Sequence, residues 1–272
     1  MRRFGWGRRR RRTAVRRPRC WRRDGDPGVT ARGLVTAGTG AAGRVHPSLL
    51  AFCDVDETLI GCKSLLDFLR FYFTERYGVS GARHSSAVVD ALGAQQAAGA
   101  SREEANRSFY RGWAGERVAA VAASGLRWYA QRSRDPDFFR PDTRAALRAH
   151  RTRGAVIALV SGSFPAVLAP IAAVVGADHL LCARPEARDG VFTGELVGGP
   201  VIAEGKRRLV RELLGCYPGV DPEDCFAYGD HVSDLPMLTE VGHPVVVGDD
   251  AELAAWLPRA PRLGHKIPSR RY

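Results

Sequence analysis

Residues 49–59 read L-L-A-F-C-D-V-D-E-T-L, and this stretch decides the fold class. Its first five residues form a continuous apolar run, which predicts a strand buried on both faces, as in parallel sheets. Asp54 and Asp56 follow the run without a break. Two carboxylates in one pocket repel each other unless a cation or a shared proton relieves the repulsion. We therefore expect a hard divalent cation where this strand ends, although D-V-D alone is a weak motif.

Four further apolar runs have the same continuous pattern and predict strands at residues 155–161, 179–183, 225–229 and 244–247. Helical patterns between the later strands predict helices at residues 164–175, 205–214 and 233–241. This alternation indicates βαβ units, and hence an α/β protein with a Rossmann-like parallel sheet core flanked by helices. The pair Asp189-Gly190 predicts the turn of a small hairpin.

One long interval interrupts the alternation. Residues 63–134 contain no strand-like run, but have amphipathic helical patterns at 65–77, 102–111 and 116–132, and an Ala/Gly-rich stretch at 91–100 that predicts a loose loop. Binding sites in open α/β sheets lie outside the carboxyl ends of the strands. A helical insertion just after Asp54 is therefore expected to cover the site. The predicted domains are a helical cap of residues 63–134 and a catalytic core of residues 47–62 and 135–272.

The net charge of +12 belongs to one end of the chain, because residues 1–46 carry fourteen Arg against only Asp24 and Asp26. This Arg/Gly-rich segment has few periodic apolar residues, so burial cannot offset the entropy lost on ordering, and we predict a disordered tail. Three interpretations remain open: a nucleic-acid-binding tail, a solvated tail without a partner, and a translation start further in, at Val29 or Val35. The last two together are favoured, since a charge run alone specifies nothing.

Composition also bears on the compartment. The chain has 272 residues, of which 45% are hydrophobic, and no apolar run approaches the ~20 residues that a membrane-spanning helix requires. A soluble protein without a membrane anchor is expected. The six cysteines include no C-x-x-C pair, and three lie in or beside predicted strands. This usage favours a reduced, cytoplasmic protein over a disulfide framework or a zinc site.

A second acidic motif follows the predicted strand at residues 225–229. Asp230 and Asp234 have D-x-x-x-D spacing directly after Gly229. Carboxylates at the ends of two separate strands supply the oxygen ligands that Mg²⁺ takes when it also keeps waters and a substrate phosphate. Asp234 is equally compatible with a plain role as an acid at a helix N-terminus.

Two further motifs carry groups that suit phosphate. Ser161-Gly162-Ser163 joins a predicted strand to a helix, where a hydroxyl and backbone N–H groups can hold an anion. Such a sequence is more often only a helix cap. Lys206 opens the predicted helix at residues 205–214, and alone it would be a solvated helix lysine.

Taken in this order, the motifs resemble those of the haloacid dehalogenase superfamily of phosphohydrolases. The resemblance extends over residues 49–247, and four motifs on the appropriate elements make it highly specific. The insertion resembles a type 1 cap, and residues 189–206 are similar to subfamily IB, the group around phosphoserine phosphatase. The residues that match the family motifs are Asp54, Asp56, Thr58, Ser161, Lys206, Gly229, Asp230 and Asp234.

The resemblance implies a role for each of these residues. Asp54 is implied as the nucleophile that forms an aspartyl phosphate, and Asp56 as the general acid and base. An alkoxide leaving group needs the proton that Asp56 can give, whereas a halide does not, which favours phosphatase over dehalogenase chemistry. The implied Mg²⁺ ligands are the Asp54 side chain, the Asp56 backbone carbonyl and Asp230, with Asp234 in support. The implied phosphate-binding groups are Thr58, Ser161, the Gly162 amide and the catalytic Lys206.

Lys63 bears on the substrate. Phosphoserine phosphatases place a Glu nine residues after the nucleophile, to meet the substrate ammonium, and here that position holds Lys63. One hypothesis is a substrate with a second anionic or hydroxyl-rich group near the phosphate; the equal alternative is a Lys63 that points into solvent. The aromatic residues of the insertion either line the pocket or, more commonly for such spacing, form its core: Phe71, Tyr72, Phe73, Trp113 and Trp128.

The sequence thus predicts a Mg²⁺-dependent phosphomonoesterase that acts on a small phosphorylated metabolite. A phosphotransferase or phosphomutase with the same aspartyl phosphate is the alternative. A nucleic-acid-binding protein that acts through the basic tail is a distant third. His231 and His243 neighbour the motifs in sequence, and structural roles are expected for both.

Overall fold

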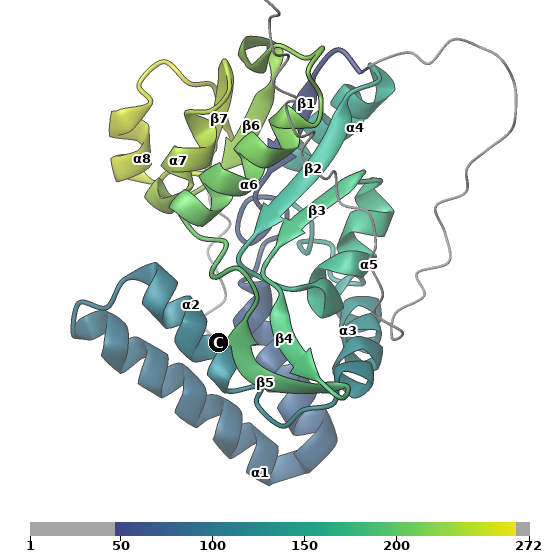
Figure 1. Ribbon diagram of the computed structural model, residues 1–272, viewed down its shortest axis with the longest axis vertical. Helices are drawn as coiled ribbons and strands as arrows, with labels where there is room; N and C mark the ends of the chain where they lie inside the picture. Colours follow the sequence, from purple (N-terminus) through teal and green to yellow (C-terminus); the bar gives the residue numbers. More distant parts are fainter. Residues whose placement is uncertain (1–46, 265–272) are drawn as a thin grey trace, which may run out of the picture.

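A computed structural model describes residues 47–264 (Figure 1). The segment for which a disordered tail is predicted, residues 1–46, lies outside the described residues. The described chain forms a core lobe, in which helices flank a sheet, and a helical lobe, which contains α1, α2, α3 and a two-stranded hairpin.

The core lobe is built on a six-stranded sheet with the order β3-β2-β1-β6-β7-β8, in which all neighbouring strands are parallel. The central strand β1 is fully buried, because its apolar run L-A-F-C is covered on both faces. The strands are β1 (Leu50–Cys53), β2 (Val156–Ser161), β3 (His179–Cys182), β6 (Phe226–Gly229), β7 (His243–Val247) and β8 (Arg262–Leu263).

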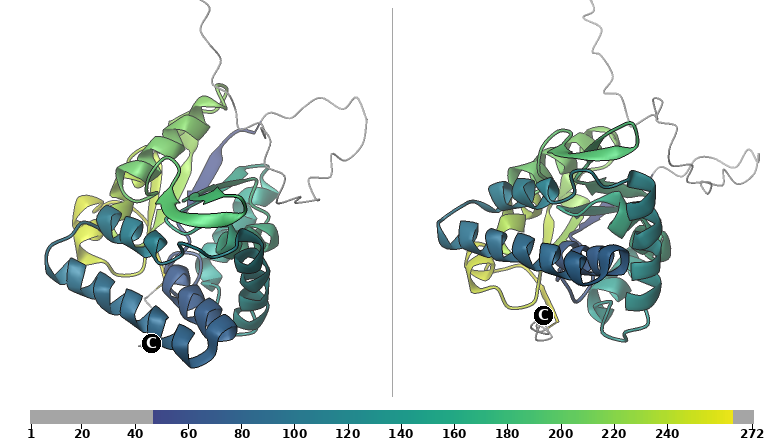
Figure 2. Two further views of the ribbon diagram at one scale, coloured as in Figure 1. Left: turned by 60° about the horizontal axis from the view of Figure 1, so that its bottom comes forward. Right: turned by 90° about the horizontal axis from the view of Figure 1, so that it is seen from below.

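Helices lie on both faces of this sheet (Figure 2). On one side of the sheet, α4 packs against β2 and α5 packs against β3. Separately, α6 packs against α7. The predicted α/β class with a Rossmann-like parallel sheet is confirmed. The helices of the core are α4 (Pro141–Thr152), α5 (Pro165–Val175), α6 (Glu204–Gly215), α7 (Leu235–Leu238) and α8 (Ala251–Trp256), with 3-10 turns η1 (Pro222–Asp224) and η2 (Val232–Asp234).

The predicted helix at residues 233–241 is shorter than expected. The chain forms the 3-10 turn η2 first, and α7 begins only at Leu235. Pro236 lies in the first turn of α7, where its missing N–H costs no helical hydrogen bond. The proline thus begins a new helix instead of continuing the turn before it.

The helical lobe contains α1 (Ser64–Ala97), α2 (Arg102–Arg111) and α3 (Val118–Arg132). The loose loop predicted at residues 91–100 is wrong for its first part, since α1 continues to Ala97. Alanine, leucine and glutamine favour helix, so Gly93 alone does not end it. The chain does bend earlier, at Gly78, whose φ of 59° and ψ of −133° interrupt the helix. That bend falls just after the predicted helix at residues 65–77.

The predicted hairpin forms as β4 (Pro185–Arg188) and β5 (Val191–Leu196), an antiparallel pair. Its two turn residues, Asp189 and Gly190, have positive φ values of 51° and 74°, which a tight two-residue hairpin requires. The hairpin packs on α2, and its Val191 pairs with Arg117, between α2 and α3. The helical lobe therefore includes a piece of chain from outside residues 63–134 (Figure 1).

The aromatic side chains of the insertion pack mainly inside this lobe. Trp113 and Trp128 are 1% and 0% exposed, and the Trp113 ring stacks on Phe68 with centroids 5.5 Å apart. Trp113 also contacts Phe164, which begins α5 in the core lobe. These rings form the core of the helical lobe and join it to the start of α5.

Candidate active site

The sheet order places several predicted site residues together. From β1 the chain goes first to β2 and β3 on one side, and later returns to β6 on the other side of β1. Binding sites in open parallel sheets lie at such a switch point, outside the carboxyl ends of the strands. Asp54 follows β1 and Asp230 follows β6, so both carboxylates emerge at this point. Ser161 ends β2, the other neighbour of β1.

Three of the predicted metal ligands form one cluster. Asp54, Asp230 and Asp234 are all buried, and each offers a carboxylate oxygen within 4.8 Å of those of the other two. The Thr58 hydroxyl lies between two of them, with Oγ1 3.0 Å from Asp54 Oδ2 and 3.0 Å from Asp230 Oδ1. Its one proton can be donated to one carboxylate at a time. In this structure Thr58 therefore orients the acidic cluster.

Lys206 supplies a positive charge to the cluster. Its Nζ donates to Asp54 Oδ1 at 2.5 Å and to Asp234 Oδ1 at 2.7 Å, and the side chain is 5% exposed. Burial lowers the pKa of Lys206, but the carboxylates of Asp234 and Asp54 more than offset this and hold the pKa well above its usual range. The lysine stays protonated at neutral pH.

Asp234 organises the turn that follows β6. Its Oδ2 accepts from the backbone N–H groups of Asp230 at 3.2 Å and His231 at 3.4 Å. A Cβ at Gly229 would lie 2.6 Å from the Asp234 Cβ, so this position needs glycine. His231 has a structural contact, because its Nδ1 accepts from the Ser233 N–H at 3.0 Å and caps η2. The D-x-x-x-D spacing thus lets one acid hold the loop that carries the other.

The cluster carries more negative charge than Lys206 balances. Burial, partly opposed by Lys206, raises the pKa of Asp54 to about 6. Burial and the neighbouring carboxylates of Asp54 and Asp234 raise the pKa of Asp230 to about 8. Both shifts express the cost of keeping several buried carboxylates charged. Buried oxygen ligands with unbalanced charge are the donor set that a small divalent cation such as Mg²⁺ takes, so the residues fit this ion.

Asp56 lies on a tight turn after β1. The N–H groups of Leu59 and Ile60 both donate to the Val55 carbonyl, at 2.9 and 3.0 Å, and Glu57 takes a φ of 60°. The turn keeps Asp56 close enough to Asp54 for the Asp54 charge to help raise its pKa. Burial raises the pKa of Asp56 to about 7, with the Ser64 hydroxyl opposing the rise. Its Oδ1 is buried without a hydrogen-bond partner among the described residues. The predicted ligation through its backbone carbonyl stays a prediction.

The segment Ser161-Gly162-Ser163 is tied both to itself and to the helical lobe. Ser161 Oγ accepts from the Ser163 N–H at 3.1 Å, as a serine that caps a turn does. The Gly162 carbonyl accepts from Asn106 Nδ2 at 3.2 Å and from Tyr110 Oη at 2.8 Å. Both donors lie on α2. The helical lobe therefore contacts the segment that the sequence predicts to bind phosphate.

Lys63 lies at the rim and not among the buried groups. Its side chain is 60% exposed, and its Nζ is 3.7 Å from Glu57 Oε2. An exposed pair of this kind contributes little stability. The possible substrate contact of Lys63 stays a prediction.

His243 takes no part in the acidic cluster. It begins β7, is exposed, and its ring stacks on Phe226.

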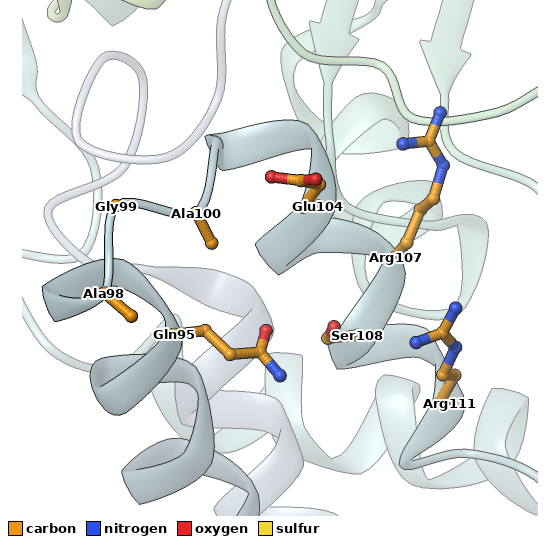
Figure 3. A pocket seen from close by; sticks show the side chains of 8 residues that line it. All are labelled: Gln95, Ala98, Gly99, Ala100, Glu104, Arg107, Ser108 and Arg111. Carbon is orange, nitrogen blue, oxygen red and sulfur yellow. The ribbon is translucent and has the colours of Figure 1, made fainter.

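A pocket of about 520 Å³ lies between the end of α1 and α2 (Figure 3). Arg107 and Arg111 line it with Ser108, and both guanidinium groups extend from α2 along one side (Figure 3). Glu104 also lines it, but one of its carboxylate oxygens accepts from the Ser101 N–H and hydroxyl. The pocket therefore offers two cationic groups to a ligand.

Several polar residues near the site have no signal in the sequence. Asn106 and Tyr110 are buried although their helix is rich in charged residues, and Ser64 Oγ donates to Ser163 Oγ at 3.2 Å. Helical periodicity shows that Asn106 and Tyr110 share a face, since they are four residues apart. It does not show that this face meets Gly162.

The α/β fold and the buried acidic cluster with Lys206 are typical of one class of hydrolases. The family model for haloacid dehalogenase-like hydrolases matches residues 51–239, so the chain belongs to that family. The sequence-based assignment to the haloacid dehalogenase superfamily is confirmed.

Particular relatives narrow the comparison. A probable phosphatase of Mycobacterium tuberculosis is 31% identical over 216 residues, which cover 75% of this chain and 70% of the relative. Phosphoserine phosphatase SerB1 of the same species is 31% identical over 227 residues, covering 81% and 71%. The predicted enzyme class, a phosphatase, agrees with these names.

Solved structures share the fold. A protein of unknown function from Bordetella pertussis Tohama I has a TM-score of 0.68 at 26% identity, covering 80% of this chain and 99% of that one. A substrate-bound phosphoserine phosphatase has a TM-score of 0.58 at 19% identity, covering 79% and 92%. At 19% identity, the similarity to the phosphoserine phosphatase structure is evidence for the fold alone.

Among residues 47–264, no helix combines the length and the apolar character needed to cross a bilayer.

Proposed function

We propose that this chain is a Mg²⁺-dependent phosphomonoesterase that works through an aspartyl phosphate on Asp54. The observation that carries the proposal is the cluster of Asp54, Asp230 and Asp234, in which the Lys206 ammonium contacts Asp54 and Asp234. A buried carboxylate can attack an anionic phosphate only where cations offset the repulsion between them. The names of the two mycobacterial relatives support the same reaction class.

Asp54, Asp230 and the Asp56 carbonyl would hold the Mg²⁺ ion, with Asp234 in support. When bound, the ion supplies positive charge that polarises the phosphoryl oxygens. Lys206 contributes a second, permanent positive charge beside Oδ1 of the Asp54 carboxylate. The Ser161 hydroxyl and the Gly162 N–H would bind the phosphoryl oxygens. These groups need little movement during the reaction, because the turns that carry them are already hydrogen-bonded.

The reaction has two displacements at phosphorus. A carboxylate oxygen of Asp54 forms a bond to phosphorus while the bond to the leaving oxygen breaks, and Asp56 gives its proton to that oxygen. Asp56 then takes a proton from water, the water oxygen bonds to phosphorus, and the bond to Asp54 breaks. The products are the alcohol and inorganic phosphate, with the Asp54 carboxylate and the protonated Asp56 carboxyl group restored. The buried Oδ1 of Asp56, which has no partner among the described residues, is available for both transfers.

The test is release of inorganic phosphate from a panel of amino-acid, sugar, polyol and nucleotide phosphates, with Mg²⁺ and no acceptor. Asp54→Asn should reduce release to background, and EDTA should do the same in the wild type. Asp90→Asn is the matched control, because Asp90 is an exposed aspartate on α1. Transfer of phosphate only to an added acceptor would instead establish a phosphotransferase. Activity retained by Asp54→Asn would refute the aspartyl phosphate.

A further inference from the structure

Asn106 is buried where the helical lobe meets the core lobe. It is 7% exposed, and its Nδ2 donates to the Gly162 carbonyl at 3.2 Å. Tyr110, one turn later on α2, donates to the same carbonyl at 2.8 Å. A Cβ at Gly162 would lie 3.3 Å from Asn106 Nδ2, so side chain and loop are in close contact. Asn106 therefore adjoins the segment proposed to bind the phosphoryl group.

The chemistry of the partner fixes the orientation of the Asn106 carboxamide. A carbonyl oxygen can only accept a hydrogen bond, so Gly162 requires the NH₂ group of Asn106 and not its oxygen. The opposite orientation would bring two acceptors together. The Asn106 Oδ1 must therefore point away from the Gly162 carbonyl.

That oxygen is buried and has no hydrogen-bond partner among the described residues. A buried acceptor without a donor is destabilising, and it normally obtains its donor from water or from a bound ligand. The Oδ1 of Asp56 is a second buried acceptor in the same condition. In the proposed reaction the leaving oxygen of the substrate meets Asp56, so the remainder of the leaving group begins in this region.

The two acceptors lie in one neighbourhood. Tyr110, which shares the Gly162 carbonyl with Asn106, has a phenol whose pKa burial raises, with smaller contributions from Cys182 and from the Asp56 charge. The contacts show the same neighbourhood: Asn106 Nδ2 lies 3.2 Å from the Gly162 carbonyl, and Ser64, whose hydroxyl opposes the rise in the pKa of Asp56, lies 3.2 Å from Ser163 Oγ. Both oxygens therefore adjoin the Ser161-Gly162-Ser163 segment, where the phosphoryl group of the substrate is proposed to bind.

We propose that Asn106 Oδ1 accepts a hydrogen bond from the leaving group, and hence that the substrate is a phosphomonoester whose alcohol carries a hydroxyl or an ammonium close to the ester oxygen. This inference rests on the proposed function. Hydroxyl and ammonium groups share the chemistry of a hydrogen-bond donor. A site built around a donor rejects an analogue that lacks it, because the buried acceptor is then left unpaired.

The pocket beside α2 offers a competing location for the leaving group. Successive residues on a helix are about 100° apart, so Arg107 and Arg111 lie on a different face from Asn106 and Tyr110. A leaving group bound by Arg107 and Arg111 would carry an anion, and its recognition would not involve Asn106 (Figure 3). The two locations therefore predict different effects of mutation.

The experiment uses three phosphomonoesters of nearly equal size: ethyl phosphate, 2-hydroxyethyl phosphate and 2-aminoethyl phosphate. The wild type should prefer one or both of the donor-bearing esters over ethyl phosphate in kcat/KM. Asn106→Leu should lower that preference by about tenfold, the effect of one hydrogen bond to a buried group. A comparison of kcat/KM for 2-hydroxyethyl phosphate and 2-aminoethyl phosphate shows which donor is recognised.

Tyr110→Phe is the matched control, because it removes one donor to the Gly162 carbonyl but leaves Asn106 Oδ1 in place. Tyr110→Phe should lower kcat/KM for all three esters by the same factor, so that the preference for the donor-bearing esters stays constant. Thermal unfolding checks that each variant folds, and Asn106→Ala replaces Asn106→Leu if the latter does not.

Two results would overturn the inference. Equal losses on all three esters in the Asn106 variants would mean that Asn106 only positions Gly162 and that water satisfies its oxygen. A loss of preference in Arg107→Gln would assign the leaving group to the pocket in Figure 3. Failure of the proposed function gives a different result, since the wild type would then release no phosphate from any ester in the presence of Mg²⁺.

Discussion

At the scale of single residues, the site depends on how buried charges are arranged. Lys206 contacts Asp54 and Asp234 directly, while the hydroxyl of Thr58 links Asp54 to Asp230. A buried ion pair contributes to stability only when the geometry satisfies each charge. Here the contacts also hold the side chain of Asp54 on two sides, Lys206 at one oxygen and Thr58 at the other. The proposed nucleophile is thereby held in one orientation.

Asp56→Asn tests the role of general acid at this scale. The amide cannot give a proton to the leaving oxygen, so alkyl phosphates should lose about 10²–10⁴-fold in kcat. An ester of p-nitrophenol, whose anion leaves without a proton, should lose much less. Steady-state kinetics on both types of ester measure the difference. Equal losses on both would show that Asp56 does not protonate the leaving group.

At the scale of elements, α2 and α3 each join the helical lobe to the core. On α2, Asn106 and Tyr110 reach the Gly162 carbonyl. On α3, Gly125 lies against the backbone of α5, where a Cβ would be only 1.9 Å from the Ala166 carbonyl oxygen. Backbone contact this close leaves no room for a side chain. The α3–α5 contact should therefore be rigid, and it adjoins the start of α5 that follows the Ser161-Gly162-Ser163 segment.

Gly125→Ala tests this contact between elements. The methyl group must push α3 away from α5, which should lower the free energy of unfolding by about 1–3 kcal/mol. Thermal or denaturant unfolding measures the change. Gly93→Ala is a control of opposite sign: Gly93 lies within α1 with open space around it, so alanine should raise stability by about 0.5–1 kcal/mol. Equal effects of the two substitutions would contradict the close packing.

At the scale of the whole molecule, the order of the strands creates the site. β1 lies between β2 and β6, so the residues at the ends of these three strands converge, although Asp54 is more than a hundred positions from both Ser161 and Asp230 in the sequence. The acids thus come from both halves of the sheet. An ion that binds them holds these halves together and should stabilise the entire fold.

Mg²⁺ should therefore raise the thermal stability of the protein. At a concentration of about 100 times its Kd, a ligand of the folded state adds about 2.7 kcal/mol, or about 5–10 °C in Tm for a chain of this size. Asp230→Asn should abolish this increase. It should also raise the Tm of the metal-free protein, because one carboxylate fewer reduces the repulsion in the cluster. A Tm independent of Mg²⁺ in the wild type, measured by calorimetry, would contradict the metal site.

Much of the core was predictable from the sequence alone. Continuous apolar runs predicted β1, β2, β3, β6 and β7, because strands buried on both faces need such runs. The family could be assigned from motifs that follow these strands directly. The two positive φ values at Asp189 and Gly190 were likewise predictable, since the D-G pair favours that turn. In each case the signal lies within a few neighbouring residues.

Only the tertiary structure decided the features that depend on distant parts of the chain. These include the position of Asn106 and Tyr110 against Gly162, the packing of the β4–β5 hairpin on α2, and the contact between Lys63 and Glu57 at the rim. The sequence by itself determined which strands form and which acids follow them, because those properties depend on local apolar pattern and turn chemistry. It did not determine which helix face meets the site, since burial of a polar side chain depends on partners that the fold brings from elsewhere.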